Sequence, residues 1–321
     1  KDDNDVWFIL DRRMHLPDAI RLQGRVSRVQ PTLLSRLAFE WKLKSLLPSD
    51  ARLLGFGNLP PLFAHHGEQT VFVQNKYLID PTPPLKHMSL PVRLRLAFER
   101  WWLRTRRQHV QHFVVQTPTM RKTLLKSFDA PVDVLPFMPE PTTSTNSAGT
   151  QVIKQYDFLY VATGESHKGH RTLIEAWVLL AGRGRFPTLA LTLSRQRFPG
   201  LCTRVQEQAR RHGLKVSLLD ECAHTDMPDL YAATKALIYP SVYESFGLPL
   251  LEAAMAGMPI IAADIDYVRD VINPTAVFDP YSAESIAESV MDFSFEPATL
   301  RITPLSANDF LGMTLNREKS G

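Results

Sequence analysis

The sequence predicts an α/β protein built from doubly wound, largely parallel sheets. Short apolar runs alternate with helical segments along the chain, as strands and crossover helices do in such folds. The length of 321 residues suits about two domains. A polar stretch rich in Pro, Ser and Thr, residues 140–151, interrupts the pattern and has the composition of a linker. We therefore expect one domain over residues 1–145 and a second over residues 151–300.

The first domain contains several short apolar runs, as strands of a buried parallel sheet do. We expect strands at residues 6–10, 51–56, 70–73, 112–116 and 132–135. Helices are expected at residues 31–47 and 91–108, together with a basic helix that ends at residue 128. Pro31 and Pro48 bound the first of these helices, because proline suits a first helical turn and stops a helix that precedes it.

The second domain starts the same alternation again after the linker. We expect strands at residues 157–162, 188–194, 216–219, 237–239 and 260–263. Helices are expected at residues 171–180, 201–212, 226–234, 250–255 and 283–291. In the tail, residues 301–321, only residues 306–313 have the pattern of a helix. Two Rossmann-like halves joined by a linker predict a cleft between domains, where ligands commonly bind.

The stretch from residue 237 to residue 271 carries the strongest signal for function. Its order is strand, loop, helix and strand, the unit whose ligands lie at the carboxyl ends of the strands. Glu244 lies in the loop, and we place Glu252 in the first turn of the helix that Pro249 opens. Gly257 and Pro259 end that helix. Both carboxylates can then face the same crevice.

The residues between the two glutamates bring backbone N–H groups to a helix N-terminus, which favours phosphate or a polar sugar. These residues are Ser245, Phe246, Gly247 and Leu248. A carboxylate beside them could accept hydrogen bonds from the two vicinal hydroxyls of a ribose. The alternative is that Glu244 is a solvated loop residue and Glu252 only complements the helix dipole.

The chain resembles the retaining family-4 glycosyltransferases, because it carries their E-x7-E signature with the glycines and proline in place. The matching string is Glu244-Ser-Phe-Gly-Leu-Pro-Leu-Leu-Glu252-Ala-Ala-Met-Ala-Gly257-Met-Pro259. The resemblance extends over residues 150–290 and, more weakly, over residues 50–140. It implies the GT-B fold, in which two Rossmann-like domains face each other across a cleft. In that family a terminal helix often crosses back to the first domain.

The resemblance also implies an activity, namely transfer of a hexose from a UDP- or GDP-linked sugar to a glycan or lipid-linked acceptor. Bacterial surface polysaccharide synthesis is the expected setting. Glu244 would contact the donor sugar and stabilise positive charge on its anomeric carbon, and Glu252 would hold the ribose. Such enzymes usually need no metal and no cofactor besides the donor substrate. The alternatives are a non-catalytic GT-B module that binds sugar or nucleotide, a sugar-nucleotide epimerase and an inverting transferase.

The turn that contains Gly164 and Lys168 follows the first strand of the second domain and resembles the family's phosphate-binding loop. A lysine there can neutralise a diphosphate leaving group, whereas most turn lysines are simply solvated. The family often has a second basic residue shortly before the lysine, where this chain has Ala162 and Thr163. Arg195 and Arg197, which follow the next strand, are possible substitutes.

Three further positions bear on the site. His167 and His170 have a spacing compatible with a metal, but no third ligand is near them in the sequence, so a structural role is the better interpretation. Asn75 follows a strand of the first domain, where several members of the family have a histidine close to the donor sugar. The family's first strand and glycine-rich loop are not evident before Val6, so we expect the first domain to lack them.

The charge is unevenly distributed. The chain has a net charge of +4, but residues 1–150 hold 21 Lys and Arg against 13 Asp and Glu, a net charge of +8. A basic half suggests an anionic partner. The expected helix at residues 91–107 has four arginines that we place on one face: Arg93, Arg100, Arg104 and Arg107. Leu94, Phe98, Trp101 and Thr105 form a neighbouring stripe.

Basic and aromatic residues together suit the headgroup region of an anionic membrane. The alternative is a stripe that faces the core, with a solvated basic back. No motif that reads nucleic acid accompanies the charge. Two cysteines are too few for a disulfide scaffold, and no apolar run reaches the length of a membrane span. We therefore expect a cytoplasmic protein, at most peripheral on the inner face of the membrane.

Overall fold

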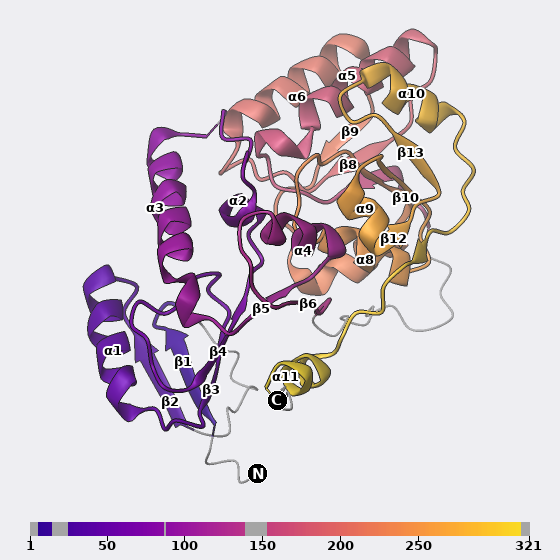
Figure 1. Ribbon diagram of the computed structural model, residues 1–321. Helices are drawn as coiled ribbons and strands as arrows, with labels where there is room; N and C mark the ends of the chain where they lie inside the picture. The colour runs from indigo at the N-terminus through magenta and orange to yellow at the C-terminus, as the bar shows by residue number, and fades with distance from the viewer. Residues whose placement is uncertain (1–5, 15–24, 87, 139–152, 316–321) are drawn as a thin grey trace.

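The computed structural model describes residues 6–14, 25–86, 88–138 and 153–315, which form two α/β domains (Figure 1). The predicted linker, residues 140–151, lies outside the described residues. Figure 1 shows the N-terminal domain in indigo and purple, and the C-terminal domain in pink to yellow. Each domain has a parallel sheet with helices packed against it, as the alternation of apolar runs and helices predicts.

The N-terminal domain contains a four-stranded parallel sheet in the order β3-β4-β5-β6. Its strands are β3 (Arg52–Gly55), β4 (Glu68–Phe72), β5 (His112–Val115) and β6 (Val132–Val134). A separate parallel pair consists of β1 (Trp7–Asp11) and β2 (Arg25–Val29). The helices are α1 (Leu33–Leu46), α2 (Lys76–Ile79), α3 (Leu90–Arg106) and α4 (Pro118–Leu125), and Arg107–His109 form a 3-10 turn.

The C-terminal domain contains a six-stranded parallel sheet in the order β13-β11-β10-β7-β8-β9. Its strands are β7 (Tyr156–Tyr160), β8 (Leu189–Leu191), β9 (Val216–Leu218), β10 (Thr234–Tyr239), β11 (Ile260–Ala263) and β13 (Ala276–Phe278). The helices are α5 (His170–Gly182), α6 (Pro199–His212), α7 (Met227–Ala232), α8 (Leu248–Met255), α9 (Asp266–Val271) and α10 (Ala283–Met291). 3-10 turns lie at Ser166–Lys168 and His224–Asp226, and β12 (Ile272–Asn273) pairs antiparallel with β14 (Thr299–Leu300).

The order of the strands in the second sheet creates a topological switch point. The chain moves outward from β7 through β8 to β9, returns to β10 beside β7, and then moves the other way through β11 to β13. The loops after β7 and β10 therefore leave the sheet toward opposite faces and open a crevice between them. Lys168 follows β7 and Glu244 follows β10, so both lie at this crevice.

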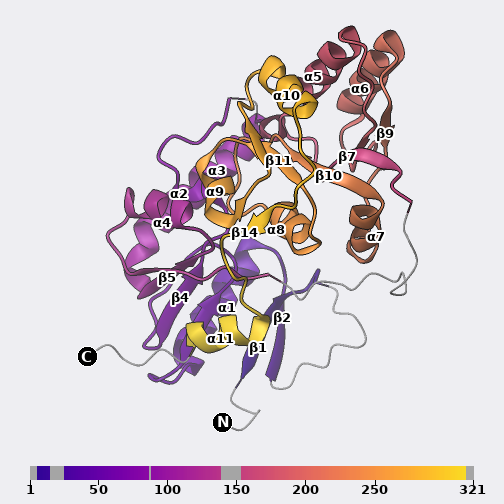
Figure 2. The same cartoon turned by 90° about the vertical axis from the view of Figure 1, so that its right-hand side faces the viewer.

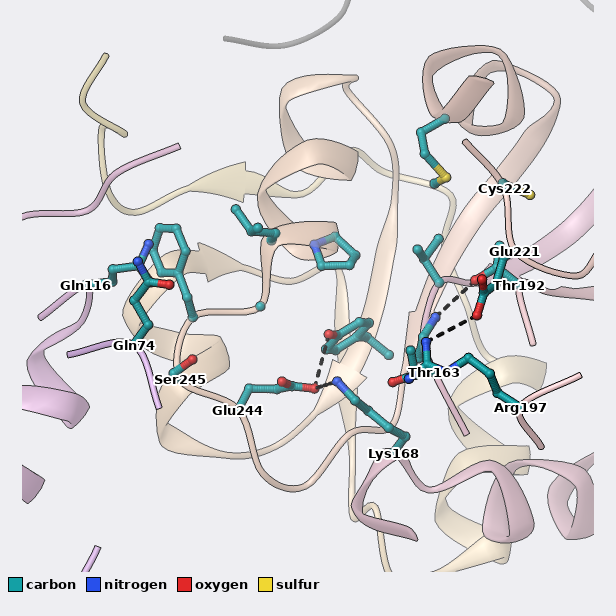
Figure 3. Close-up of a pocket in the computed structure, with 18 residues that line it drawn as sticks. Gln74, Gln116, Thr163, Lys168, Thr192, Arg197, Glu221, Cys222, Glu244 and Ser245 are labelled. Atoms are coloured by element: carbon teal, nitrogen blue, oxygen red, sulfur yellow. Dashed lines mark hydrogen bonds and ion pairs between the residues drawn. The ribbon is translucent and has the colours of Figure 1, made fainter. Parts of the chain in front are cut away.

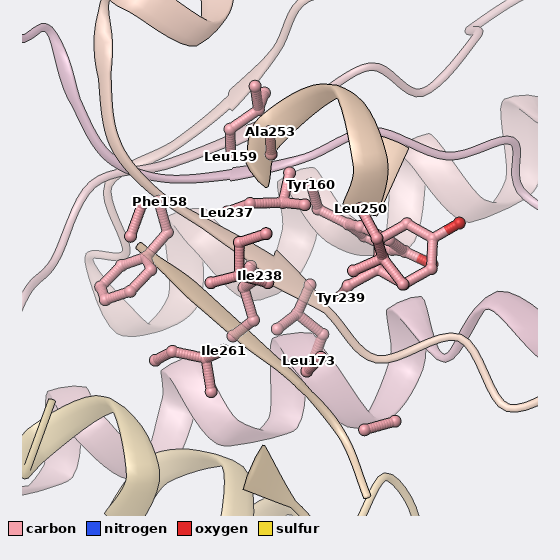
Figure 4. Close-up of a cluster of buried hydrophobic side chains, with 14 of the residues drawn as sticks. Phe158, Leu159, Tyr160, Leu173, Leu237, Ile238, Tyr239, Leu250, Ala253 and Ile261 are labelled. Atoms are coloured by element: carbon pink, nitrogen blue, oxygen red, sulfur yellow. The ribbon is translucent and has the colours of Figure 1, made fainter. Parts of the chain in front are cut away.

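The core of the C-terminal domain lies on both faces of its sheet. Strands β7 and β10 are buried on both sides, which explains their nearly continuous apolar sequences. Figure 4 shows Leu173 of α5 beneath these strands, and Leu250 and Ala253 of α8 above them. All three side chains are fully buried. Packing from both faces fixes the positions of the strand ends that carry the loops of the crevice.

The tail lies against the N-terminal domain. Its helix, α11 (Ala307–Leu315), packs against β3, and Figures 1 and 2 both show it at the end of the molecule that carries the N-terminal domain. The ring centroid of Phe310 lies 4.9 Å from that of Phe72 and 5.0 Å from that of Phe137. The guanidinium of Arg52 also donates to the carbonyl of Leu315. The tail thus covers one face of the first sheet.

Several short elements are not among those that the sequence predicts. They are β2, α2, α9, β12, β13 and β14. Each has only two to six residues, too few to show a helical or alternating period. Strand β13, for example, exists because Ala276 and Phe278 pair with Ile261 and Ala263 of the buried strand β11. Such elements form where a neighbouring element offers backbone partners.

Helix α3 corrects the predicted arrangement of its arginines. Arg100 does not lie free beside the others, because its Nη1 donates to the carbonyls of Tyr77 at 2.6 Å and Asp80 at 2.5 Å. Its guanidinium therefore binds the end of α2. The stripe that contains Leu94 and Trp101 does not face the core either, since these side chains are 62% and 56% exposed. The core-facing residues of α3 are Leu96, Trp102 and Leu103.

Candidate active site

A pocket of about 590 Å³ opens where the two domains meet, within the size range typical of sites for small molecules. Figure 3 shows that its residues come from loops at the carboxyl ends of strands in both sheets. The lining residues are Gln74, Gln116, Val161, Ala162, Thr163, Lys168, Thr192, Arg197, Glu221, Cys222, Met227, Tyr239, Glu244, Ser245, Phe246, Gly247, Leu248 and Pro249. The pocket thus lies at the crevice that the strand order creates.

Lys168 and Glu244 point toward each other in the middle of the pocket (Figure 3). They form a close ion pair, and their side chains are only 14% and 15% exposed. The carboxylate of Glu244 also accepts hydrogen bonds from Ser241 Oγ at 2.6 Å and Tyr239 Oη at 3.3 Å. Ser241 and Tyr239 are themselves buried, so they hold the carboxylate in one orientation. Glu244 is therefore not a solvated loop residue.

Close packing of two loops brings Lys168 to Glu244. The backbone N–H of Val242 donates to the carbonyl of His167 at 2.8 Å. Gly169 has a φ of +74°, and a Cβ built there would lie 2.8 Å from the carbonyl oxygen of Pro240. Glycine is required at this point because both the backbone angle and the contact exclude a side chain. This approach fixes the position of the lysine that precedes it.

The N-terminus of α8 lies beside the ion pair and has no side-chain cap. Gly247, with a φ of +80°, occupies the N-cap position and offers no side-chain acceptor. The first N–H groups of a helix have no partner within the helix, so they are available to an anion. Ser245, Phe246, Gly247 and Leu248 all line the pocket, as the sequence predicts for a phosphate or sugar site.

Glu252 lies elsewhere than the sequence analysis places it. Helix α8 begins at Leu248 because Gly247 lets the chain turn early, so Glu252 is in the second turn and not in the first. Its carboxylate accepts a hydrogen bond of 2.7 Å from Tyr231 Oη of α7. Burial raises the pKa of Tyr231, which keeps its hydroxyl a donor. Glu252 is not among the residues that line the pocket.

Asn75 and Gly164 also lie beside the pocket and not in its wall. The side chain of Asn75 accepts from the backbone N–H of Tyr77 at 3.0 Å and thereby caps α2. Its neighbour Gln74 lines the pocket instead. A Cβ at Gly164 would lie 2.5 Å from the ring of Phe198, so this glycine lets the loop after β7 pack against that ring.

The two histidines of the turn have different surroundings. Nδ1 of His167 lies 3.2 Å from the hydroxyl of Tyr77 in the other domain. His170 is buried against Tyr160, and neither of its ring nitrogens has a hydrogen-bond partner. Burial lowers the pKa of His170 to about 4, so the ring is neutral at physiological pH. Among the residues that the structure describes, no group of three or more His, Cys, Asp or Glu is placed to hold a metal ion.

The two domains touch beside the pocket. Tyr243 Oη donates to the carboxylate of Asp80 at 2.9 Å, and the rings of Tyr243 and Tyr77 lie 4.5 Å apart. On another part of the interface, the backbone N–H of Thr119 donates to the carboxylate of Asp270 at 2.7 Å. These contacts hold the N-terminal strand ends over the loop that carries Glu244.

Several residues of the pocket wall are not among those that the sequence predicts. They are Gln74, Gln116, Thr192, Glu221, Cys222 and Met227. Gln74 and Gln116 follow β4 and β5, and Thr192 directly follows β8. Inspection of each strand's carboxyl end could have found them, because parallel strands place these ends at one edge. Arg197, considered only as a substitute cation, also lines the wall.

The C-terminal part of the chain is similar in sequence to proteins that are named for sugar transfer. Residues 148–301 match the family model described as glycosyl transferases group 1. The O-antigen chain mannosyltransferase B of Escherichia coli is 33% identical over 136 residues, which are 41% of this chain and 35% of that protein. The lipopolysaccharide glucosyltransferase WaaG of Escherichia coli (strain K12) is 26% identical over 134 residues, covering 40% of this chain and 35% of WaaG. The matched part thus spans about a third of these relatives.

Solved structures extend the similarity beyond the matched domain. The sucrose-phosphate synthase of Thermosynechococcus elongatus superposes with a TM-score of 0.64 at 17% identity, covering 89% of this chain and 79% of that chain. A crystal structure of WaaG, a glycosyltransferase involved in lipopolysaccharide biosynthesis, gives a TM-score of 0.61 at 18% identity, covering 85% and 78%.

The fold is GT-B.

The predicted fold class is therefore confirmed over both domains. In GT-B terms, the pocket lies in the cleft between the two Rossmann-like domains, and most of its wall belongs to the domain that matches the family model. Only Gln74 and Gln116 come from the N-terminal domain. A ligand that fills the pocket would therefore contact mainly the C-terminal domain.

Proposed function

We propose that this GT-B protein is a retaining glycosyltransferase that moves a hexose from a nucleotide-diphosphate sugar to a glycan or lipid-linked acceptor. The observation that carries the proposal is the meeting of Glu244, Lys168 and the uncapped N-terminus of α8 in one pocket. The names of the relatives make mannose the first sugar to test and surface polysaccharide the first class of acceptor.

The reaction breaks the bond between the anomeric carbon and the diphosphate oxygen, and forms one to an acceptor hydroxyl. Negative charge grows on the departing diphosphate, where Lys168 and the N–H groups of α8 would stabilise it. Positive charge grows on the anomeric carbon, where the carboxylate of Glu244 would stabilise it. The acceptor hydroxyl would pass its proton to the departing diphosphate oxygen, which keeps the electron pair of the broken bond. Lys168 and the helix N–H groups are positive where the transition state becomes negative, and Glu244 is negative where it becomes positive.

The ion pair has a consequence for donor binding. Lys168 contacts Glu244, so its ammonium would be shared between carboxylate and phosphate when a donor binds. Ser241 and Tyr239 would hold the carboxylate in place while this happens. In this proposal no metal is needed to neutralise the diphosphate, since lysine and helix N–H groups take that role.

A panel of nucleotide sugars tests the proposal, with released nucleotide as the readout. We expect release from at least one UDP- or GDP-linked hexose, faster in the presence of a glycan acceptor. Lys168→Ala should lower donor affinity and turnover together, because the ammonium meets the diphosphate in both the ground state and the transition state. Unchanged kinetics in this variant would assign Lys168 to a structural role.

We further propose that α3 contacts an anionic membrane, where a lipid-linked acceptor would be found. Leu90, Leu94, Phe98 and Trp101 form an exposed stripe along α3. Arg93 and Arg104 lie exposed on the same helix, whereas Arg100 is used within the fold. Apolar insertion together with basic residues is the pattern of an interfacial helix, and each basic residue near such a surface contributes about 1 kcal/mol. No described helix is long and apolar enough to span a bilayer.

Co-sedimentation with anionic and neutral vesicles at low and high salt tests this contact. Arg93→Glu/Arg104→Glu should abolish binding to anionic vesicles at low salt. Arg210→Glu/Arg211→Glu is the matched control, since it makes the same charge change on exposed residues of α6 in the other domain. Equal loss of vesicle binding in both variants would show that only net charge matters. Binding that does not depend on salt or lipid charge would show that α3 does not contact the membrane in the proposed way.

A further inference from the structure

The end of the pocket that is farthest from the N-terminal domain carries a charged pair that the proposed chemistry does not use. Arg197 follows β8 and Glu221 follows β9, and both side chains line the pocket. Arg197 Nη1 lies 3.2 Å from Glu221 Oε1, and its Nη2 lies 3.9 Å from Glu165 Oε1. Figure 3 shows the pair opposite Gln74 and Gln116.

The pair is placed to meet a ligand and not only solvent. The guanidinium of Arg197 lies over the ring of Phe198, with 5.4 Å to the ring centroid. The side chains of Arg197 and Glu221 are 54% and 55% exposed, so a molecule in the pocket can cover them. Cys222 lies at the same end of the pocket in Figure 3, and it and Met227 of the pocket wall offer apolar contact to a flat ring.

The strand order places this pair where the base of a donor would lie. The diphosphate and sugar groups of the donor are assigned to the ends of β10 and β7. Strand β9 is three neighbours away from β10 in the sheet, which is about 14 Å at the usual spacing of strands. A nucleotide sugar needs a span of this order to run from its anomeric carbon through the diphosphate and ribose to the base. The other end of the pocket, at Gln74 and Gln116, is left for the acceptor.

The chemistry of the pair matches one base better than another. Arginine only donates hydrogen bonds and an ionised glutamate only accepts them, so together they present guanidinium donors beside the two acceptor oxygens of a carboxylate. Guanine offers the complementary edge, with the O6 acceptor beside the N1–H and N2–H₂ donors. Uracil offers an acceptor, a donor and a second acceptor. The second carbonyl oxygen of uracil would face a carboxylate oxygen of Glu221. Both atoms are acceptors, so no hydrogen bond could form between them.

We propose that Arg197 and Glu221 read the base of the donor and select guanosine over uridine. This inference rests on the proposed function, because it assumes a nucleotide-diphosphate sugar in the pocket. A site built to receive a hydrogen bond discriminates strongly against a ligand that cannot make it, since its polar group is then left unpaired. GDP should therefore bind at least tenfold more tightly than UDP.

Titration calorimetry of the purified protein with GDP, IDP and UDP tests the assignment. IDP lacks the 2-amino group of guanine, so its affinity should fall between those of GDP and UDP. In Glu221→Gln the amide offers one acceptor and one donor, a pattern that suits uracil. The ratio of the GDP and UDP dissociation constants should shift toward UDP by at least tenfold in this variant.

Asp220→Asn is the matched control. Asp220 is the neighbouring carboxylate, pairs with Arg195 at 3.6 Å and does not line the pocket. Its Oδ1 accepts from the backbone N–H groups of Arg195 and Glu221, and an asparagine oxygen can still do so. The positive φ of +64° at this position also suits asparagine. The preference for GDP should survive this change.

The outcomes separate this inference from the proposed function. If the wild-type protein binds none of the three nucleotides, the proposed function itself fails. If it binds UDP as tightly as GDP, or if Glu221→Gln keeps the wild-type ratio, the donor site stands but Arg197 and Glu221 do not read the base. An equal shift in Asp220→Asn would also overturn the assignment, because the effect would then not depend on contact with the pocket.

Discussion

The two domains are built from the same kinds of element, but their sheets are covered differently. In the C-terminal domain one continuous apolar cluster surrounds the strands, and most of it comes from residues of the domain itself. In the N-terminal domain the core is split into two clusters. The smaller cluster packs Phe72, Val114 and Leu135 against Phe310, which comes from the other end of the chain.

The difference extends to the pocket. The C-terminal domain supplies the ion pair, the uncapped helix end and the pair formed by Arg197 and Glu221, whereas the N-terminal domain supplies two glutamines. Buried Tyr239 and Ser241 hold the carboxylate of Glu244 in one orientation, which the proposed site for a charged donor requires. The N-terminal sheet depends on the tail for one of its faces. We therefore expect substitutions where the tail meets the N-terminal sheet to lower stability, and substitutions in the pocket of the C-terminal domain to change donor chemistry.

The largest effect is expected from Phe310→Ala in the tail. Phe310 is 1% exposed, and removal of a buried phenylalanine costs about 3–5 kcal/mol. Tryptophan fluorescence during urea unfolding measures the loss, because Trp7, Trp41, Trp101 and Trp102 lie in the N-terminal domain and only Trp177 in the other. Leu311→Ala on the same helix, at a residue that is 38% exposed, is the control. Equal stability losses in the two variants would show that the tail does not complete the core.

The second effect concerns the two glutamates and leaves the fold intact. Glu244→Gln should lower kcat about 10²–10³-fold, the usual cost of removing one group that stabilises transition-state charge. Glu252→Gln should leave kcat nearly unchanged and affect nucleotide binding only indirectly, because its carboxylate bonds Tyr231 and lies outside the pocket wall. Steady-state kinetics with the active donor distinguish the two. Small and equal effects would count against the role assigned to Glu244.

The third effect is a pH dependence of stability that belongs to the C-terminal domain. The pKa of His170 is about 4 in the folded chain, below its ordinary value of 6.5, because burial disfavours the charged ring. The unfolded chain therefore binds more protons between these values, and stability falls as the pH drops from 6.5 toward 4. The full loss is about 3 kcal/mol, from about 1.4 kcal/mol per unit of pKa.

Urea unfolding of the wild type and of His170→Leu between pH 4 and 7 measures this dependence. The variant should lose most of the slope, because leucine does not titrate. Burial lowers the pKa of His167 as well, so some slope should remain in the variant. A wild-type slope that persists unchanged in His170→Leu would show that other groups cause it.

The smallest effect is expected at the contact between the domains. Tyr243→Phe removes the hydroxyl that donates to Asp80, a hydrogen bond that should contribute about 1 kcal/mol. A double-mutant cycle with Asp80→Ala, measured as free energies of unfolding in urea, should give a coupling free energy of that size. Tyr281→Phe, at a tyrosine that is 76% exposed, should give no coupling with Asp80→Ala. Zero coupling for Tyr243 would mean that this bond does not hold the domains together in solution.

Local patterns in the sequence were enough to predict the fold and the centre of the site. Apolar runs bounded by Pro and Gly mark most of the strands, because a buried parallel strand needs a continuous apolar stretch. The loop after β10 could be assigned to a crevice because strand, loop and helix follow one another within a few residues. Glu244 and residues 245–248 lie in the pocket wall for this reason. The GT-B fold was reached through the resemblance that the same string carries.

Only the tertiary structure decided which distant residues meet. Lys168 and Glu244 are 76 residues apart, and their contact depends on the packing of two loops against Gly169. Glu252 bonds Tyr231 and lies outside the pocket wall. Arg100 of α3 binds carbonyl groups at the end of α2 and does not lie free on the exposed face of its helix. A sequence pattern reports preferences over one or two turns. Contacts between loops depend on the strand order and on which backbone groups still need a hydrogen-bond partner. Both are determined only when the chain has folded.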